Sequence, residues 1–299
     1  MQQNERAGLL FTMAGFIVLS SGDGLVKSMA GEWAPTAIAA ARYSIGAIGL
    51  AALLLLREGP RAFRMPRPGI QFLRGLSVSM ATVGFFSAVM LMPLAEATTI
   101  VFVSPMITAL LAWFFLGEKA RRETFIASVV AFIGVIIVLR PNIAGLGWAA
   151  CLPLLSALGM SLLFIANRTV AGTGSALAMQ AYVAIMATPI LILAAFVGDY
   201  SGVPALELTM PHWSVLARCA LVACSATIAH WLIYLGTTRA GAATVAPMTY
   251  VQLLVAVTLG WVFYHDRPDA VSMLGGAIII GAGLYLWHSG RVREPAMTD

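Results

Sequence analysis

Trp113-Phe114-Phe115-Leu116-Gly117-Glu118-Lys119 returns, at an offset of 148 (261 − 113), as Trp261-Val262-Phe263-Tyr264-His265-Asp266-Arg267. The same offset aligns Phe102 with Tyr250. Five apolar stretches, each long enough to cross a bilayer, lie between the copies, and an odd number of crossings turns the second copy upside down. Inverted repeats are typical of secondary transporters, whose substrate site lies where the two halves meet.

The composition is that of a polytopic membrane protein. Of the 299 residues, 60% are hydrophobic and 10% are charged, with a mean hydropathy of +0.89, whereas a soluble domain carries about 25% charged residues. A spanning helix needs about 20 apolar residues. Ten stretches fit this length: 8–29, 34–56, 71–92, 94–116, 123–140, 146–167, 175–197, 212–236, 240–264 and 269–288. We therefore predict an all-α fold of ten transmembrane helices in two inverted five-helix repeats, residues 1–143 and 144–299.

The basic residues give the expected orientation, because cytoplasmic loops are rich in Lys and Arg. A cytoplasmic N-terminus places most of the basic residues inside, including the cluster from Arg57 to Arg74. Residues 8–26 lack a small-residue cleavage site, so we expect them to remain as the first anchor. These features predict a multi-pass protein of the bacterial inner (plasma) membrane with both termini cytoplasmic. No nucleic-acid-binding motif accompanies the basic cluster, so we expect no nucleic-acid partner.

Other classes of protein lack their usual signals. The three cysteines and four histidines are scattered, which predicts neither a disulfide framework nor a metal site. A membrane-embedded enzyme would need an acid, base or metal cluster at one level, and a passive channel would need a ring of like groups. There is no GxxxxGK[ST] loop for ATP. We expect no cofactor, no metal and no enzymatic activity.

Several further motifs follow a known pattern. They are Leu91–Thr98 with its Leu-Ala-Glu-Ala core, Ser104-Pro105, Leu116–Lys119, Ala34-Pro35 before Ala41-Arg42-Tyr43, and Ala243–Val251. These residues resemble the EamA-type members of the drug/metabolite transporter (DMT) superfamily, although His265-Asp266 stands where that family usually has Gly-Glu. The resemblance implies ten helices in two inverted halves and transport of small organic metabolites without ATP. Within the family, the pattern is most similar to a bacterial amino-acid exporter.

We therefore predict a transporter, in the exporting direction, of amino acids or similar small zwitterionic metabolites by alternating access. The alternative within the family is a carrier of a riboflavin-like, S-adenosylmethionine-like or drug substrate. The expected partners are this small-molecule substrate and the lipid bilayer. The oligomeric state is left open.

The repeat selects four candidate substrate-binding residues in the middle of two predicted spans. Ser104 aligns with Gln252 and Phe102 with Tyr250. Gln252 could bind an amino or carboxylate group, while the aromatic rings could line an apolar side-chain pocket. The alternative is helix–helix hydrogen bonding by Ser104 and Gln252 and core packing by the aromatic residues.

His230 and Tyr234 are four residues apart and so lie on one face of the predicted span 212–236, which we interpret as lining the cavity. The alternative for His230 is a buried imidazole satisfied by a neighbouring helix. A role in proton transfer is left open.

Four charged residues are candidates for gating. Asp23 and Lys27 could form an ion pair, and Arg42 could join them in an outer network. The alternative for Lys27 and Arg42 is extension of the side chain to the interface. Glu96 could cap its helix or bind a cationic group.

Four prolines lie inside predicted spans and are candidate hinges, because each removes one backbone hydrogen bond: Pro105, Pro153, Pro189 and Pro247. A static kink is the alternative. The spacing of Ala277 and Gly281 predicts close helix packing, and Gly22 and Gly24 could loosen the helix around Asp23.

Overall fold

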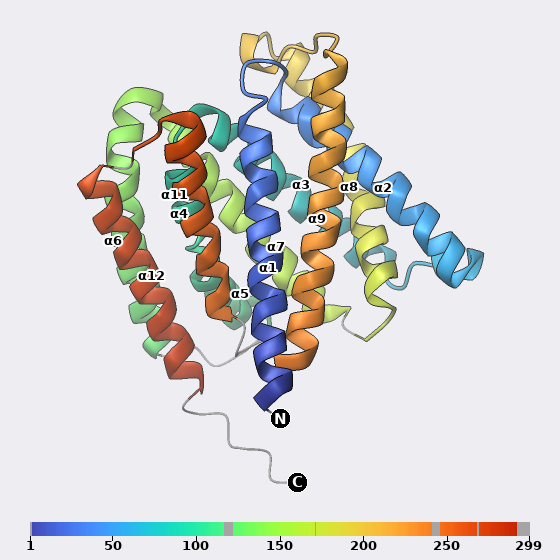
Figure 1. The fold of residues 1–299 in the computed structure, drawn as a ribbon, viewed down its shortest axis with the longest axis horizontal. Helices are drawn as coiled ribbons and strands as arrows, with labels where there is room; N and C mark the ends of the chain where they lie inside the picture. The colour runs from blue at the N-terminus through green and yellow to red at the C-terminus, as the bar shows by residue number, and fades with distance from the viewer. Residues whose placement is uncertain (1, 117–121, 171, 241–245, 268, 292–299) are drawn as a thin grey trace.

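The computed structural model describes residues 2–116, 122–170, 172–240, 246–267 and 269–291, and every regular element within these ranges is helical. Most helices run side by side in one bundle (Figure 1). The longer elements are α1 (Gln2–Lys27), α2 (Pro35–Glu58), α3 (Pro68–Leu91), α4 (Leu94–Val101), α5 (Ser104–Leu116), α6 (Arg122–Leu146), α7 (Leu152–Thr169), α8 (Ala176–Tyr200), α9 (Trp213–Ala240), α11 (Val251–Tyr264) and α12 (Ala270–Arg291). Short 3₁₀ segments are η1 (Pro60–Phe63), η2 (Gly147–Cys151), η3 (Pro204–Leu206) and η4 (Ala246–Tyr250).

Within the described residues, the predicted apolar stretches coincide with helical segments, while residues 241–245 of the stretch 240–264 lie outside the described residues. Among the described residues, seven helices are long and apolar enough to cross a membrane, and three shorter apolar helices occupy the remaining stretches: Phe125–Val138, Met248–Tyr264 and Ala270–Tyr285. The chain is therefore an all-helical, multi-pass membrane protein. The count of ten crossings and the inversion of the halves stay predictions. The Gly117–Lys119 part of the first repeat copy lies outside the described residues.

Glycines let the helices approach closely. A Cβ atom on Gly236 of α9 would lie 1.9 Å from Thr12 Oγ1 of α1, and one on Gly134 of α6 would lie 2.8 Å from the Gly275 carbonyl of α12. Small residues at helix contacts are typical of membrane proteins. The predicted contact at Gly281 is wrong, since a Cβ there would meet nothing within 4 Å. A helix that is apolar on all sides does not reveal from sequence which face meets its neighbour.

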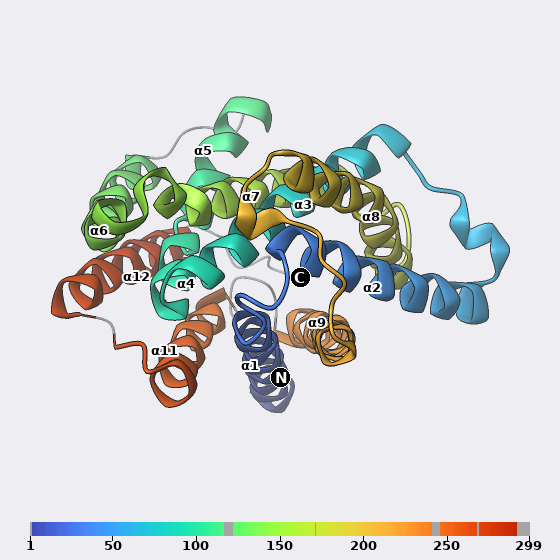
Figure 2. The same cartoon turned by 90° about the horizontal axis from the view of Figure 1, so that it is seen from above.

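The bundle has a central group of helices between two outer pairs. α6 packs against α12 at one side, and α2 packs against α8 at the other (Figure 2). α1, α3, α4, α7, α9 and α11 lie between these pairs, with α1 against α9 and α11, and α3 against α7. All predicted substrate-binding residues lie on or next to these central elements.

Candidate substrate site

Phe102 and Tyr250, the residues that the repeat aligns, are in contact. α4 ends at Val101 and α5 begins at Ser104, because Pro105 has no N–H to donate to the Val101 carbonyl. Phe102 lies in the turn between these helices, and Tyr250 lies at the equivalent change from η4 to α11. The two rings stand edge to face, with centroids 5.4 Å apart and planes at 89°. The chain therefore changes helical geometry at both members of this contact.

The main-chain carbonyls of Ser104 and Gln252 join their helices to neighbouring ones. Ser161 Oγ of α7 donates to the Ser104 carbonyl over 2.9 Å, and Ser20 Oγ of α1 donates to the Gln252 carbonyl over 3.1 Å. The Ser104 side chain is buried and that of Gln252 is partly buried. Helix–helix hydrogen bonding is thus present at both positions, through carbonyls rather than side chains. Substrate binding by the side chains stays a prediction.

Asp23 on α1 and Arg42 on α2 carry opposite charges and lie beside the same stretch of α9: a Cβ on Gly22 would lie 2.8 Å from Ser225 Oγ, and one on Gly46, one turn after Arg42, would lie 4.0 Å from Ala223 Cβ. They do not form an ion pair, and neither has a hydrogen-bond partner in the part of the chain that the structure describes. Both side chains are only partly buried, and no polar atom of either is sealed away without a partner. The two charges are therefore accessible and unpaired.

α1 is continuous through Asp23 although glycines flank it. A Cβ atom on Gly22 would lie 2.8 Å from Ser225 Oγ of α9, and one on Gly24 would lie 2.9 Å from Leu259 Cδ1 of α11. The glycines therefore allow close packing against two neighbours, and loosening of the helix at Asp23 stays a prediction.

Aromatic rings hold the Arg42 guanidinium in place. Its central carbon lies 4.9 Å from the centroid of Tyr43 and 5.4 Å from that of Phe86 on α3. Thr82 Oγ1 is hydrogen-bonded to Tyr43 Oη at 3.2 Å, which fixes one of these rings. Stacked on aromatic faces, the guanidinium keeps its N–H edges free for a carboxylate.

His230 and Tyr234 lie one turn apart on an exposed face of α9. His230 Nδ1 lies 2.6 Å from the Ala226 carbonyl, so Nδ1 carries the proton and Nε2 is left for another partner. Cavity lining by both side chains stays a prediction.

Lys27 does not pair with Asp23 as predicted. Its Nζ lies 2.7 Å from Asp266 Oδ2, beyond the end of α11, and donates to the Met92 carbonyl over 2.9 Å. Tyr264, next to this pair, donates to the Gly24 carbonyl over 2.6 Å. At the 148-residue offset Asp266 aligns with Glu118, a carboxylate at the end of the first copy.

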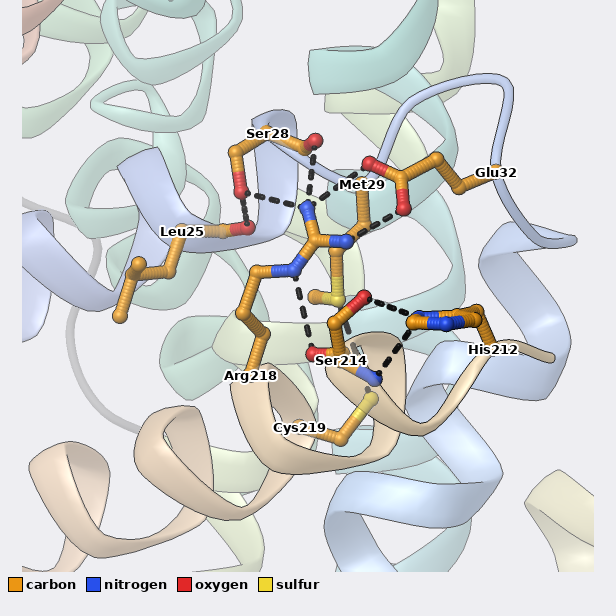
Figure 3. A network of polar contacts seen from close by, with 8 residues as sticks. All are labelled: Leu25, Ser28, Met29, Glu32, His212, Ser214, Arg218 and Cys219. Carbon is orange, nitrogen blue, oxygen red and sulfur yellow. Dashed lines mark hydrogen bonds and ion pairs between the residues drawn. The ribbon is translucent and has the colours of Figure 1, made fainter.

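A second ion pair lies at the same end of the bundle (Figure 3). Arg218 of α9 forms a two-pronged pair with Glu32, in which Nη1 and Oε1 are 2.9 Å apart. Arg218 also donates to the carbonyls of Ser28 and Ser214, and His212 Nδ1 lies 2.9 Å from Ser214 Oγ. The hydrogen bond from Arg218 lowers the pKa of Glu32 below its usual range. No sequence pattern predicted this pair, whose members are 186 residues apart.

We call this end of the bundle, marked by Lys27, Glu32, Arg218 and Asp266, the Lys27 end. Both of its ion pairs join the N-terminal third of the chain to α9 or to the segment after α11. Opening this end would require both pairs to separate.

Glu96 is buried in the first turn of α4, where a carboxylate is favourable near the helix N-terminus. Its Oε1 accepts a hydrogen bond from Ser272 Oγ of α12 over 3.2 Å. Ser272 is itself held by its backbone N–H, which donates to Asp269 Oδ1. The position fits the predicted capping role and adds a link between α4 and α12.

The four prolines differ in what they do to their helices. Pro105 and Pro153 are the second residues of α5 and α7, directly after a break or a 3₁₀ segment, and Pro247 lies within η4. Pro189 lies inside α8, which continues through it. Pro189 therefore does not end its helix. Hinge motion at all four prolines stays a prediction.

An all-helical bundle with charged and polar side chains on its central helices is compatible with a membrane transporter. The sequence pattern of the EamA-like transporter family matches the chain twice, over residues 6–140 and 147–287. The chain therefore belongs to the EamA-like transporter family, which confirms the membership predicted from sequence. Among the described residues, no group of three or more His, Cys, Asp or Glu side chains could hold a metal ion.

Characterised relatives transport different molecules. The chain is 28% identical to the riboflavin transporter of Rhizobium johnstonii, over 81% of this chain and 78% of that protein. It is 26% identical to the S-adenosylmethionine uptake transporter of Rickettsia bellii (77% and 76% covered). It is 25% identical to the pseudopaline exporter CntI of Pseudomonas aeruginosa (94% and 96% covered). A solved crystal structure has the same fold, with a TM-score of 0.64 and 18% identity over 97% of this chain and all of that one.

Proposed function

We propose that this protein exports amino acids or similar small zwitterionic metabolites across the bacterial inner membrane, by alternating access of two inverted five-helix halves. The observation that supports this most is the pattern of contacts between residues 1–143 and 144–299. In this scheme α1, α2, α3, α4–α5 and α6 correspond to α7, α8, α9, η4–α11 and α12.

The extensive helix contacts between the halves have two-fold symmetry. When both helices of a contact are replaced by their counterparts in the other half, the result is again an observed contact. α1 packs on α9, and the counterpart pairing of α7 on α3 is also extensive. α2 on α9 corresponds to α8 on α3, and α1 on α11 corresponds to α7 on α4 and α5. The remaining extensive contacts each join a helix to its own equivalent in the other half, and symmetry leaves them unchanged: α2–α8, α4–α11 and α6–α12. Two inverted repeats related by an axis in the membrane plane would produce this pattern.

Individual contacts follow the same exchange. The hydrogen bond from Ser161 to the Ser104 carbonyl corresponds to the one from Ser20 to the Gln252 carbonyl, because Ser104 and Gln252 are equivalent at the 148-residue offset. Phe102 and Tyr250, also equivalent, touch each other. Equivalent residues meet only near a symmetry axis, so we place the substrate site beside this aromatic pair.

The Lys27 end would serve as the external gate. The basic residues orient it outward, and its ion pairs connect the two proposed halves, from Lys27 to Asp266 and from Glu32 to Arg218. Separation of these pairs would admit or release the substrate on that side.

The relatives leave two substrate classes. An S-adenosylmethionine transporter handles a molecule with an amino-acid head group, which supports a zwitterionic substrate. A riboflavin transporter supports the alternative, a neutral flavin-like substrate. The unpaired opposite charges of Asp23 and Arg42 favour the first class, because a neutral substrate would leave both without a partner.

Counterflow in proteoliposomes tests the proposal. The purified protein, reconstituted with an unlabelled amino acid inside, should accumulate the same radiolabelled amino acid by saturable exchange. The panel covers the common amino acids, S-adenosylmethionine and riboflavin, with protein-free liposomes as the blank. Exchange of riboflavin without any zwitterion would establish the alternative, and exchange of neither would reject both.

A further inference from the structure

Several charged side chains of the bundle have a polar partner. Lys27 pairs with Asp266, Arg218 pairs with Glu32, and Arg74 Nε donates to Asn167 Oδ1 over 2.6 Å. Asp23 and Arg42 have no such partner in the described ranges.

Unpaired charges inside spanning helices carry a free-energy cost, and they mark substrate or ion pathways. Asp23 and Arg42 are only partly buried, and both lie beside the Ala223–Ser225 stretch of α9 without forming an ion pair. A molecule with both an anionic and a cationic group could bind to these two side chains together.

The surroundings of Arg42 prepare it for a planar anion. Tyr43 and Phe86 stack against the guanidinium, so its orientation is fixed and its N–H edges remain open. A guanidinium in this state binds a carboxylate through two parallel hydrogen bonds. Asp23, an acceptor when ionised, matches an ammonium group.

We propose that Arg42 and Asp23 form a two-point site for a zwitterionic head group, in which Arg42 binds the carboxylate and Asp23 binds the ammonium. This inference rests on the proposed function and names its specificity: the α-amino-acid head group is recognised, while the remainder of the substrate varies.

The test uses substrate analogues that lack either the carboxylate or the ammonium group. For leucine, the matching amine is 3-methylbutylamine and the matching acid is 4-methylpentanoate. Each competes against radiolabelled leucine counterflow, or against another exchanged amino acid with its own amine and acid. In the wild type, the zwitterion should inhibit at least tenfold more strongly than either analogue.

The variants should change this preference in opposite directions. Asp23→Asn removes the ammonium partner, so the acid should compete as well as the zwitterion. Arg42→Gln removes the carboxylate partner, so the amine should compete as well as the zwitterion. Arg42→Lys keeps the positive charge but cannot donate two parallel hydrogen bonds to a carboxylate, so it should retain a weakened carboxylate preference. A matched control is Arg239→Gln, because Arg239 also stacks on an aromatic ring, 4.6 Å from Phe11, but lies at the far end of α9.

The outcomes separate the two proposals. Size-exclusion profiles identify variants that do not fold. If Arg42→Gln does not fold, Asp23→Asn and Arg42→Lys still test the proposal. Wild-type ratios of zwitterion to amine and acid in the folded variants would overturn the two-point site while leaving amino-acid transport intact. Absence of amino-acid exchange by the wild type would overturn both.

Discussion

Replacing Lys27 by alanine tests the Lys27 end as a gate. Asp266 Oδ2 is fully buried and has no hydrogen-bond donor besides its ion-pair partner, Lys27, 2.7 Å away. The substitution would therefore leave a buried carboxylate uncompensated. We expect the protein to respond by opening this end, so that water reaches Asp266.

The size of the effect follows from the burial of the pair. Breaking a fully buried ion pair costs about 3–5 kcal/mol. The Lys27 and Asp266 side chains retain 12% and 21% of their exposure, so solvent screening reduces the loss to about 2 kcal/mol. Each 1.4 kcal/mol is a factor of ten, so the ratio of closed to open forms should fall by about 30-fold.

The native thiol of Cys219 reports on this opening. Cys219 is buried beneath the Lys27 end, with its Sγ 3.9 Å from Met29 Sδ, whereas Cys151 is partly buried and Cys224 is exposed. Cys151 and Cys224 are first replaced by serine. The rate at which N-ethylmaleimide then alkylates Cys219 in detergent measures how often this end opens. Lys27→Ala should accelerate the reaction by about 30-fold if opening limits it.

A double-mutant cycle decides whether the ion pair is the cause. Lys27→Ala combined with Asp266→Ala removes the buried charge together with its partner, so the double variant should react more slowly than Lys27→Ala alone. Arg239→Ala, at the other end of α9, should behave like the parent. An unchanged rate in a folded Lys27→Ala variant, or simple additivity of the two substitutions, would refute the reasoning.

Three further predictions follow from single contacts. Arg218 lowers the pKa of Glu32, so the pair should stabilise the protein above the usual pKa of a glutamate and lose this contribution as the pH falls through the lowered value; thermal unfolding from pH 7 to 3 should show this loss for the wild type and not for Glu32→Gln. Gly236→Ala should lower stability by about 1–3 kcal/mol, because its Cβ would lie 1.9 Å from Thr12 Oγ1, while Gly281→Ala should be neutral in the same melts. Tyr250→Phe keeps the edge-to-face contact with Phe102 and should retain counterflow, whereas Tyr250→Ala loses about 0.5–1.5 kcal/mol of ring contact and should slow it.

Much of the fold could be predicted because apolar composition and length decide where helices lie in a membrane. Pro105 marked the break between α4 and α5, since a missing N–H is visible in sequence. The repeat aligned Phe102 with Tyr250, and the two rings are in contact. Aligning two copies of a sequence requires no knowledge of how each helix is rotated.

The partners of charged residues could not be predicted in this way. Lys27 pairs with Asp266, 239 residues later, and not with Asp23 on its own helix. The end of α1 and the segment after α11 lie at the same end of the bundle, which brings these two side chains together. Arg218 and Glu32 meet for the same reason. The face of α12 that packs on α6 also depends on rotation, which an evenly apolar sequence leaves undetermined, and Gly275 rather than Gly281 makes the contact.

α1 carries the unpaired charge and the gate charge one turn apart, since four residues separate Asp23 from Lys27. On the proposed function, an empty Asp23 competes with Asp266 for Lys27, and a substrate ammonium on Asp23 ends that competition, so binding favours a closed Lys27 end. Opposite charges at this spacing interact by only about 0.2–0.5 kcal/mol, well below the loss of about 2 kcal/mol expected for the gate pair itself. A ligand shifts an equilibrium only by its difference in affinity for the two states. The coupling through α1 can therefore bias the gate, but the larger part of the shift must come from substrate contacts that differ between the open and closed forms.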